Sequence, residues 1–433
     1  MRVQLSRRRK KPGSRYVAAS LAVATCSLLN ASVGRSIAEE EKKWFFDTAV
    51  LYYDEQDRVS DVSANILVRR AFTKARSLLA RLSYDTLTGA SASGAVPAGT
   101  PQTFTSPSAR STYTTPAGEI PLDSTFLDTR VGLTVNWHQP FGATEADFGA
   151  SFSTEYDYLH TGLNAGFSRD FNQHNTKLSG GFAFASDSLD PVGGAPIPLA
   201  PMLPPGDTSN KGGSESKTVT DLLVGVTQVL TPRTVAQFNY SYSQSSGYLT
   251  DPYKLISVVD PVTGDPAPGP GGLNLYLFED RPDSRGKHSL FAQVKRHLKR
   301  DIVDGSYRFM IDDWDVISHT IDFRYRWQLG GYYIQPHVRF YTQSAAQFYR
   351  GALFQGDSLP DHVSADYRIG EFDAYTIGVK YGRLLDDDKE WGIRIEYYKQ
   401  TGRSPPDISV GSLRDFDLDY GIDALIIQAG YRF

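Results

Sequence analysis

The sequence of 433 residues is long enough for one large all-β domain or for two or three ordinary domains. Its formal net charge of −4 gives no indication of a nucleic-acid partner. Aromatic residues (25 Tyr and 23 Phe) and turn-forming residues (38 Gly and 24 Pro) are both abundant, a mixture typical of many strands separated by loops rather than of long helices.

The first 38 residues predict a secretory signal peptide that is removed. Basic residues at 7–11 precede an apolar stretch at 16–29, and small residues around 36–38 offer a cleavage point. A membrane anchor is the alternative, although about 14 apolar residues are short for a bilayer span. The only cysteine, Cys26, lies in this stretch, where lipidation is a further alternative. Residues 39–433 would then contain no disulfide and no thiolate metal site.

Beyond residue 38, apolar and polar residues alternate in many segments. In one of them, Leu127, Val131 and Trp137 would lie on one face of a strand, and Asp128 and Arg130 on the other. Soluble sandwiches alternate as well, but many segments here reach about ten residues, which exceeds the usual strand length. Strands of that length cross the hydrocarbon core of a bilayer when they are tilted.

We predict sixteen strands in all, and therefore an all-β fold, a transmembrane antiparallel up-and-down β-barrel. An even number suits a bacterial barrel whose termini both lie on the periplasmic side, and one missed or added hairpin would give fourteen or eighteen. The predicted strands cover residues 44–54, 62–72, 77–88, 125–138, 145–158, 161–171, 175–186, 216–230, 233–246, 287–298, 304–313, 318–328, 331–344, 372–384, 390–401 and 419–433.

The connections between these strands are of two kinds. Every long connection follows an odd-numbered strand, is rich in Gly and Pro, and is polar; connections after even-numbered strands are short. Outer-membrane barrels combine long external loops with short periplasmic turns, so we predict that residues 39–433 form one barrel with long extracellular loops. These loops lie near 89–124, 187–215, 247–286, 345–371 and 402–418.

Many polar positions of the alternating pattern are charged and would line the lumen. One interpretation is a charged constriction that selects solutes, and the alternative is a set of mutually paired charges that stabilises the barrel wall. Arginines on adjacent strands form the densest patch, which would favour anions if they are unpaired. The candidate lumen residues are Asp128, Arg130, Glu155, Lys295, Arg308, Asp322, Arg324, Arg326, His337, Arg339, Lys380, Arg394 and Glu396.

Two further groups contain residue types that can carry chemistry. Asp312, Asp313, Asp315 and His319 are weak candidates for a divalent-cation site, and the alternative is a solvated turn anchored at the membrane interface by Trp314.

The flanks of the loop at 247–286 carry aromatic and charged residues that could fold inward as a constriction or lid, although its Pro/Gly-rich centre favours surface decoration. These residues are Tyr248, Tyr253, Arg281, Asp283 and Arg285. Ser344 follows His337 in the chain, but no pattern marks a nucleophile with its base. We therefore expect no enzyme and no cofactor.

Several segments resemble a family of bacterial outer-membrane proteins catalogued only as a domain of unknown function. The resemblance covers the C-terminal half best, in the segments "QVLTPRTVAQFNYSYSQSSGYLTDPYK", "EDRPDSRGKHSLFAQVKRHL", "YRFMIDDWDVISHTIDFRYRW", "VRFYTQSAAQFY" and "DHVSADYRIGEFDAYTIGVKYG". It implies an outer-membrane barrel of a Gram-negative bacterium, and proximity to periplasmic redox or flavin-modifying proteins. It implies no reaction, substrate or binding residue.

The functional prediction is a porin-like or solute-specific channel for a small polar or anionic solute. The alternatives are a plugged barrel that serves as a scaffold for a periplasmic redox or surface complex, and an outer-membrane enzyme. The sequence ends on a strand with Tyr431 and Phe433 on the lipid side, which resembles the signal read by the barrel-assembly machinery. Outer-membrane lipid and that machinery are the expected partners, and the oligomeric state stays open.

Overall fold

The structure, a computed structural model, describes residues 44–433 apart from 74, 106–111, 205, 386–388, 404–407, 417, 419 and 420. The predicted signal peptide lies outside the described residues. No helix in the described part is long and apolar enough to cross a bilayer.

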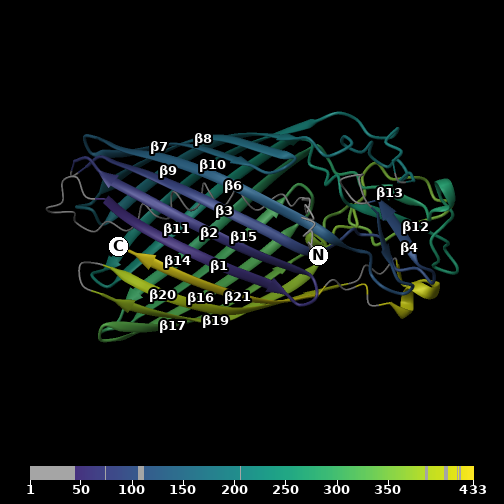
Figure 1. The fold of residues 1–433 in the computed structure, drawn as a ribbon. Coiled ribbons are helices and arrows are strands. Elements are labelled where there is room, and N and C mark those ends of the chain that lie inside the picture. The colour runs from purple at the N-terminus through teal and green to yellow at the C-terminus, as the bar shows by residue number, and fades with distance from the viewer. Residues whose placement is uncertain are drawn as a thin grey trace, which may run out of the picture.

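Sixteen strands of the described chain form one closed antiparallel barrel, in which each strand pairs with its neighbours in chain order and the last pairs with the first (Figure 1). They are β1 (Trp44–Glu55), β2 (Val59–Ala71), β3 (Ser77–Ala92), β6 (Leu122–Phe141), β7 (Thr144–Thr154), β8 (Tyr158–Phe171), β9 (Thr176–Leu189), β10 (Glu215–Thr231), β11 (Thr234–Gly247), β14 (Ser284–His297), β15 (Ile302–Asp312), β16 (Ile317–Leu329), β17 (Tyr332–Gln343), β19 (Phe372–Leu384), β20 (Glu390–Gly402) and β21 (Ile422–Arg432). The predicted fold class is confirmed, and only the strand ends shift.

The barrel has an apolar outer face and a polar inner face. Large apolar side chains such as Leu163 and Ile377 are exposed, and they alternate along each strand with polar ones. Polar side chains reach across an intervening strand, as Lys177 on β9 does to Glu145 on β7, with 2.8 Å between Nζ and Oε2. Side chains converge on the concave inside of a barrel and diverge on its convex outside, so such contacts identify the polar face as the lumen.

The barrel closes where the first described strand meets the last one. Asp47 of β1 is opposite Arg432 of β21. Phe433 continues the pairing, because its N–H donates to the carbonyl of Phe46 (3.0 Å) and its own carbonyl accepts from the N–H of Phe46 (2.9 Å). The rings of Phe433 and Tyr431 stack at 5.3 Å. Their role as an assembly signal stays a prediction.

The five long connections gather at the end of the barrel away from the C-terminus, at the right of Figure 1. We call this unit the cap. It contains β4 (Gln102–Thr105), β5 (Thr112–Thr115), β12 (Leu255–Val259), β13 (Tyr276–Phe278) and β18 (Leu353–Phe354), with the short 3-10 helices η2 (Pro270–Gly272), η3 (Tyr367–Ile369) and η5 (Gly411–Asp415). β12 is buried along its whole length and pairs with β13 antiparallel and with β18 parallel.

The cap has hydrophobic clusters of its own, built from different connections. One brings together Ala95, Phe104, Met202, Leu255, Tyr276 and Phe278. Another brings together Val96, Val259, Ala352, Ile408, Leu413 and Leu418. The sequence interpretation of these connections as polar loops was therefore incomplete: short apolar runs inside them fold into a common core.

Candidate functional site

The structure places the predicted lumen residues on the inner face of the barrel, with Glu155 just after β7 at the cap end. They lie on β6 (Asp128, Arg130), β14 (Lys295), β15 (Arg308), β16 (Asp322, Arg324, Arg326), β17 (His337, Arg339), β19 (Lys380) and β20 (Arg394, Glu396). Most of them make an ion pair with another described residue, whereas Arg308, Arg326 and Arg339 do not.

His337 is at the centre of the largest charge cluster in the wall. Its Nδ1 lies 2.7 Å from Oε1 of Glu396, and its Nε2 lies 2.8 Å from Oδ2 of Asp322. Arg324 donates to the same oxygen of Asp322 at 3.2 Å. The Nε atom of Arg394 lies 3.8 Å from Oε1 of Glu396. The cluster therefore ties β16, β17 and β20 together from the inside.

A glycine makes the contact between His337 and Glu396 possible. Gly378 on the intervening β19 is opposite His337 on one side and opposite Glu396 on the other. A Cβ atom there would lie 2.4 Å from Cγ of Glu396 and 2.6 Å from the carbonyl oxygen of Ile395. The missing side chain leaves the space in which the imidazole and the carboxylate meet.

A second cluster lies toward the end opposite the cap. The hydroxyl of Tyr333 donates to Glu390 at 2.5 Å, and Lys380 donates to the same oxygen at 3.3 Å. The guanidinium carbon of Arg326 lies 3.6 Å from the centre of the Tyr333 ring, which is a cation–π contact. Sequence reasoning missed both Tyr333 and Glu390, although they obey the same alternation.

The other predicted charges of the wall are also engaged. Arg130 donates to Asp85 on β3 through two nitrogens, at 2.9 and 2.8 Å. Lys295 lies 3.7 Å from Asp304 on β15. Asp128 is buried and accepts from the N–H of Thr129 at 2.8 Å.

Arg308 and Arg339 differ from these residues. Both side chains are exposed toward the lumen, and neither makes an ion pair with any described residue. The guanidinium of Arg308 lies 5.7 Å from the ring centre of Phe291, and the two cations are close enough to repel each other. Two guanidinium groups that make no ion pair are suited to bidentate binding of carboxylate or phosphate groups.

The four weak metal candidates are not brought together. Asp312 points inward and binds Arg285, with 2.8 Å to Nε, whereas His319 faces outward and contacts the hydroxyl of Tyr307 at 2.7 Å. Asp313 accepts from the N–H of Gly286 at 2.8 Å, and Asp315 has a positive φ of 63° in the turn. Among the described residues, no group of three or more His, Cys, Asp or Glu residues is arranged to hold a metal ion.

The alternative interpretation, in which Trp314 anchors the turn at the membrane interface, is wrong. It is buried, its ring meets that of Phe348 edge-on at 5.0 Å, and its Nε1–H donates to the carbonyl of Ser284 at 2.9 Å. The Trp therefore fastens the cap to the barrel rim. Ser344 is engaged with the backbone, where its hydroxyl accepts from the N–H of Ile317 at 2.8 Å.

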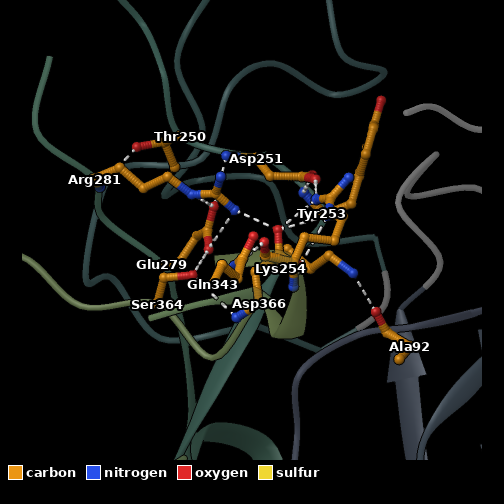
Figure 2. Close-up of polar contacts among 11 residues, drawn as sticks. Ala92, Thr250, Asp251, Tyr253, Lys254, Glu279, Arg281, Gln343, Ser364 and Asp366 are labelled. Carbon is orange, nitrogen blue, oxygen red and sulfur yellow. Dashed lines mark hydrogen bonds and ion pairs between the residues drawn. The ribbon is translucent and has the colours of Figure 1, made fainter. Parts of the chain in front are cut away.

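The cap contains a buried ion network that the sequence did not predict, apart from Arg281 (Figure 2). Arg281 donates to Asp366 at 2.7 Å and to Glu279 at 3.1 Å, and Arg368 donates to Asp366 at 2.8 Å. Arg368 also binds Asp251 at 2.5 Å. The network joins the connection after β11 to the connection after β17.

Three further contacts fix this network to the barrel. Lys254 extends away from the carboxylates in Figure 2, and its Nζ donates to the carbonyl of Ala92 at the end of β3, at 2.5 Å. Gln343 at the end of β17 donates to the carbonyl of Gly370 at 2.7 Å. Tyr253 donates to Asp157, which follows β7. The cap is thereby anchored at separate points around the barrel mouth.

Burial and charge act in opposite directions on these carboxylates. Burial alone would raise the pKa of Asp366, but Arg368, Lys254 and Arg281 hold it well below its ordinary value. The pKa of Asp251 is lowered in the same way, with Arg368 as the main opponent of burial. Burial raises the pKa of Glu279 against the attraction of Arg281. Burial lowers the pKa of Lys254 to about 8, against the attraction of Asp366.

These directions predict an acid limit for the cap. A carboxylate whose pKa is depressed by folding contributes stability above its ordinary pKa of about 3.9, and this stability is lost as the pH falls through the lower folded value. We expect amide hydrogen exchange in 364–370, corrected for intrinsic rates, to be steady down to about pH 4 and to rise below it. Glu279, whose pKa is raised, loses nothing when it is protonated.

The control for the acid limit is Asp366→Asn. This variant lacks the contribution of Asp366 at every pH, so its exchange in 364–370 should already be raised at neutral pH. Equal protection in the original protein at neutral pH and at about pH 2 would contradict the assignment.

Comparison with known protein families matches residues 18–433 to a family described as "Protein of unknown function (DUF3570)". The sequence matches no curated protein significantly.

Solved structures that are similar to this chain include several outer-membrane proteins. A bacterial polysaccharide outer membrane secretin is 10% identical with a TM-score of 0.44, covering 91% of this chain and 100% of that chain. OmpT of Vibrio cholerae is 8% identical with a TM-score of 0.41, covering 92% and 99%. The ferric enterobactin receptor of Pseudomonas aeruginosa is 10% identical with a TM-score of 0.42, covering 85% of this chain but only 56% of the receptor.

Proposed function

We propose that this chain, which belongs to the family described as "Protein of unknown function (DUF3570)", is an outer-membrane barrel whose lumen selects small anionic solutes. The observation that carries the proposal is the pair Arg308 and Arg339, which face the lumen without an ion pair among the described residues. Neighbouring charges such as Arg324, His337 and Arg394 take part in ion pairs, and these two arginines add positive potential that no ion pair offsets.

Placement in the outer membrane is supported by the wall of the barrel. Its shortest strands have 11 residues, which is enough for a tilted strand to cross the hydrocarbon core. The exposed side chains of the outer face are largely apolar, whereas the inner face is polar, as a water-filled membrane barrel requires. Closure leaves no unpaired strand edge in lipid.

Selection of anions follows from the chemistry of guanidinium. Each Arg offers a planar fork of N–H donors and stays charged at any physiological pH, so carboxylate, sulfate or phosphate groups are favoured over cations. Two such groups that make no ion pair also repel each other, and an arriving anion relieves this repulsion. Small anionic metabolites are therefore the proposed solutes.

Planar-bilayer recording of the purified protein tests this proposal. Under a salt gradient, the reversal potential of the original protein should indicate a preference for chloride over potassium, and Arg308→Gln/Arg339→Gln should lower that preference about fivefold, because a unit charge at about 4 Å in water is worth about 1 kcal/mol. The matched control is Arg233→Gln/Arg300→Gln, which removes two exposed arginines from the turns at the other end. Equal reversal potentials for all three proteins would overturn the proposal.

The cap favours a second candidate function. The connections that form it share buried hydrophobic clusters and a buried ion network, so it is built as a folded unit over one mouth. Such a cap suits a barrel that binds a solute or a partner, including a periplasmic redox or surface complex, without passing it. A protein that inserts into bilayers and stays electrically silent would support this candidate and exclude the channel.

A further inference from the structure

The imidazole of His337 is held between two carboxylates. Its two ring nitrogens lie 2.7 Å from Glu396 and 2.8 Å from Asp322. When both carboxylates are ionised they only accept hydrogen bonds, so both ring nitrogens carry a proton and the ring is a cation.

The position of Asp322 is informative because it is not bound to its direct neighbour. In the pairing of β16 with β17, Asp322 is opposite Arg339. Residues opposite each other in an antiparallel pair have Cβ atoms roughly 5 Å apart, and opposite charges there normally interact. Asp322 instead binds His337 and Arg324, and Arg339 is left exposed without an ion pair among the described residues.

The charged and titratable groups that surround His337 come from four strands. On β16 they are Asp322 and Arg324; on its own strand, Arg339 and Tyr341; on β19, Lys380; and on β20, Arg394, Glu396 and Tyr398. Arginines stay charged at any pH used with proteins, so His337 is the group in this cluster suited to change charge near neutral pH.

We propose that His337 is a specificity-determining positioning residue, whose positive charge keeps Asp322 away from Arg339 and so keeps the lumen selective for anions. The inference rests on the proposed function. When the imidazole loses a proton, it can donate to only one of its two carboxylates. The released carboxylate turns to a neighbouring arginine, and the lumen loses the charge of the ring as well. Anion preference therefore falls as the pH rises.

The test is the reversal potential of the full-length protein in planar bilayers under a potassium chloride gradient, recorded from about pH 5 to about pH 9. Anion preference of the original protein should fall about fivefold across this range. His337→Gln should show the low preference at every pH, since its amide carries no positive charge at any pH. His337→Lys should keep the high preference throughout, because its ammonium does not titrate in this range.

Substitution of Asp322 distinguishes this mechanism from a general effect of pH on the channel. Asp322→Asn leaves Arg339 without a competing charge, so its anion preference should exceed that of the original protein at high pH. Folding of each variant is checked by the heat-modifiable band of the barrel on gels. A pH step that persists in His337→Gln, or an original protein that is anion-selective but independent of pH, would overturn the inference. An original protein without anion preference at any pH would instead refute the proposed function.

Discussion

Replacing Arg281 with methionine is expected to destabilise the cap by about 3–5 kcal/mol. The guanidinium of Arg281 is buried between Glu279 and Asp366, whose side chains are inaccessible to water. Its removal leaves Glu279 with a buried charge and no guanidinium, and removes one of the two that bind Asp366. Amide hydrogen exchange in 251–259 and 364–370 measures the effect, because local opening of the cap exposes these segments.

The matched control for this substitution is Arg403→Met. Arg403 also binds two carboxylates, Glu371 at 2.5 Å and Asp373 at 3.3 Å, but its side chain is 62% exposed. An exposed ion pair is worth at most about 1 kcal/mol, so exchange should change little. If both variants opened the cap equally, burial of the network would not be what stabilises it. If Arg281→Met/Glu279→Gln recovered much of the lost protection, the unpaired charge would be identified as the cause.

Replacing Gly378 with alanine is expected to destabilise the barrel by about 2–5 kcal/mol, even though alanine adds only one methyl group. The new Cβ would overlap Cγ of Glu396 at 2.4 Å and the carbonyl of Ile395 at 2.6 Å, and the latter is backbone of the adjacent strand. Glu396 must move, and His337 then loses one of its two carboxylates. Urea unfolding in detergent, followed by the shift of the heat-modifiable band, measures the loss.

Gly305→Ala is the control for this second substitution. Gly305 also lies within a barrel strand, but a Cβ there would meet only Cδ2 of Phe323, at 3.9 Å, which is ordinary contact. Alanine at this position should be neutral or slightly stabilising, because glycine in a strand is entropically unfavourable. Equal destabilisation by the two substitutions would show that the space over Gly378 is not required for the contact between His337 and Glu396.

The barrel was predictable because its determinants are local. A period of two places alternate residues on opposite faces, and the long connections after odd-numbered strands reveal the orientation without any knowledge of pairing. For the same reason the inward position of Asp322, His337 and Arg339 was predictable from each strand taken alone. The ends of the strands could not be predicted in this way, since they depend on where the connections fold back.

The alternating pattern could not predict which side chains pair across strands, or how the long connections fold together into the cap. Whether Arg339 makes an ion pair depends on whether Asp322 binds Arg339 or His337. Predicting this would require the register of β16 against β17 and the space over Gly378. The run at 255–259 is apolar and β-branched, and this is a signal for a strand that the surrounding Pro and Gly obscured. The partners of Arg281 lie on both sides in the chain, up to 85 residues away at Asp366.

The joining of β1 to β21 has a consequence for the order of events during biogenesis. Phe46 exchanges two backbone hydrogen bonds with Phe433, at the last position of the sequence. The edge of β1 therefore stays without its partner until β21 has been synthesised and delivered, and contacts of such long range form slowly. An open edge invites pairing with other chains, so the polypeptide is prone to aggregate until β21 has joined β1. We expect truncation within 422–433 to leave the edge of β1 open and to lower the yield of folded barrel.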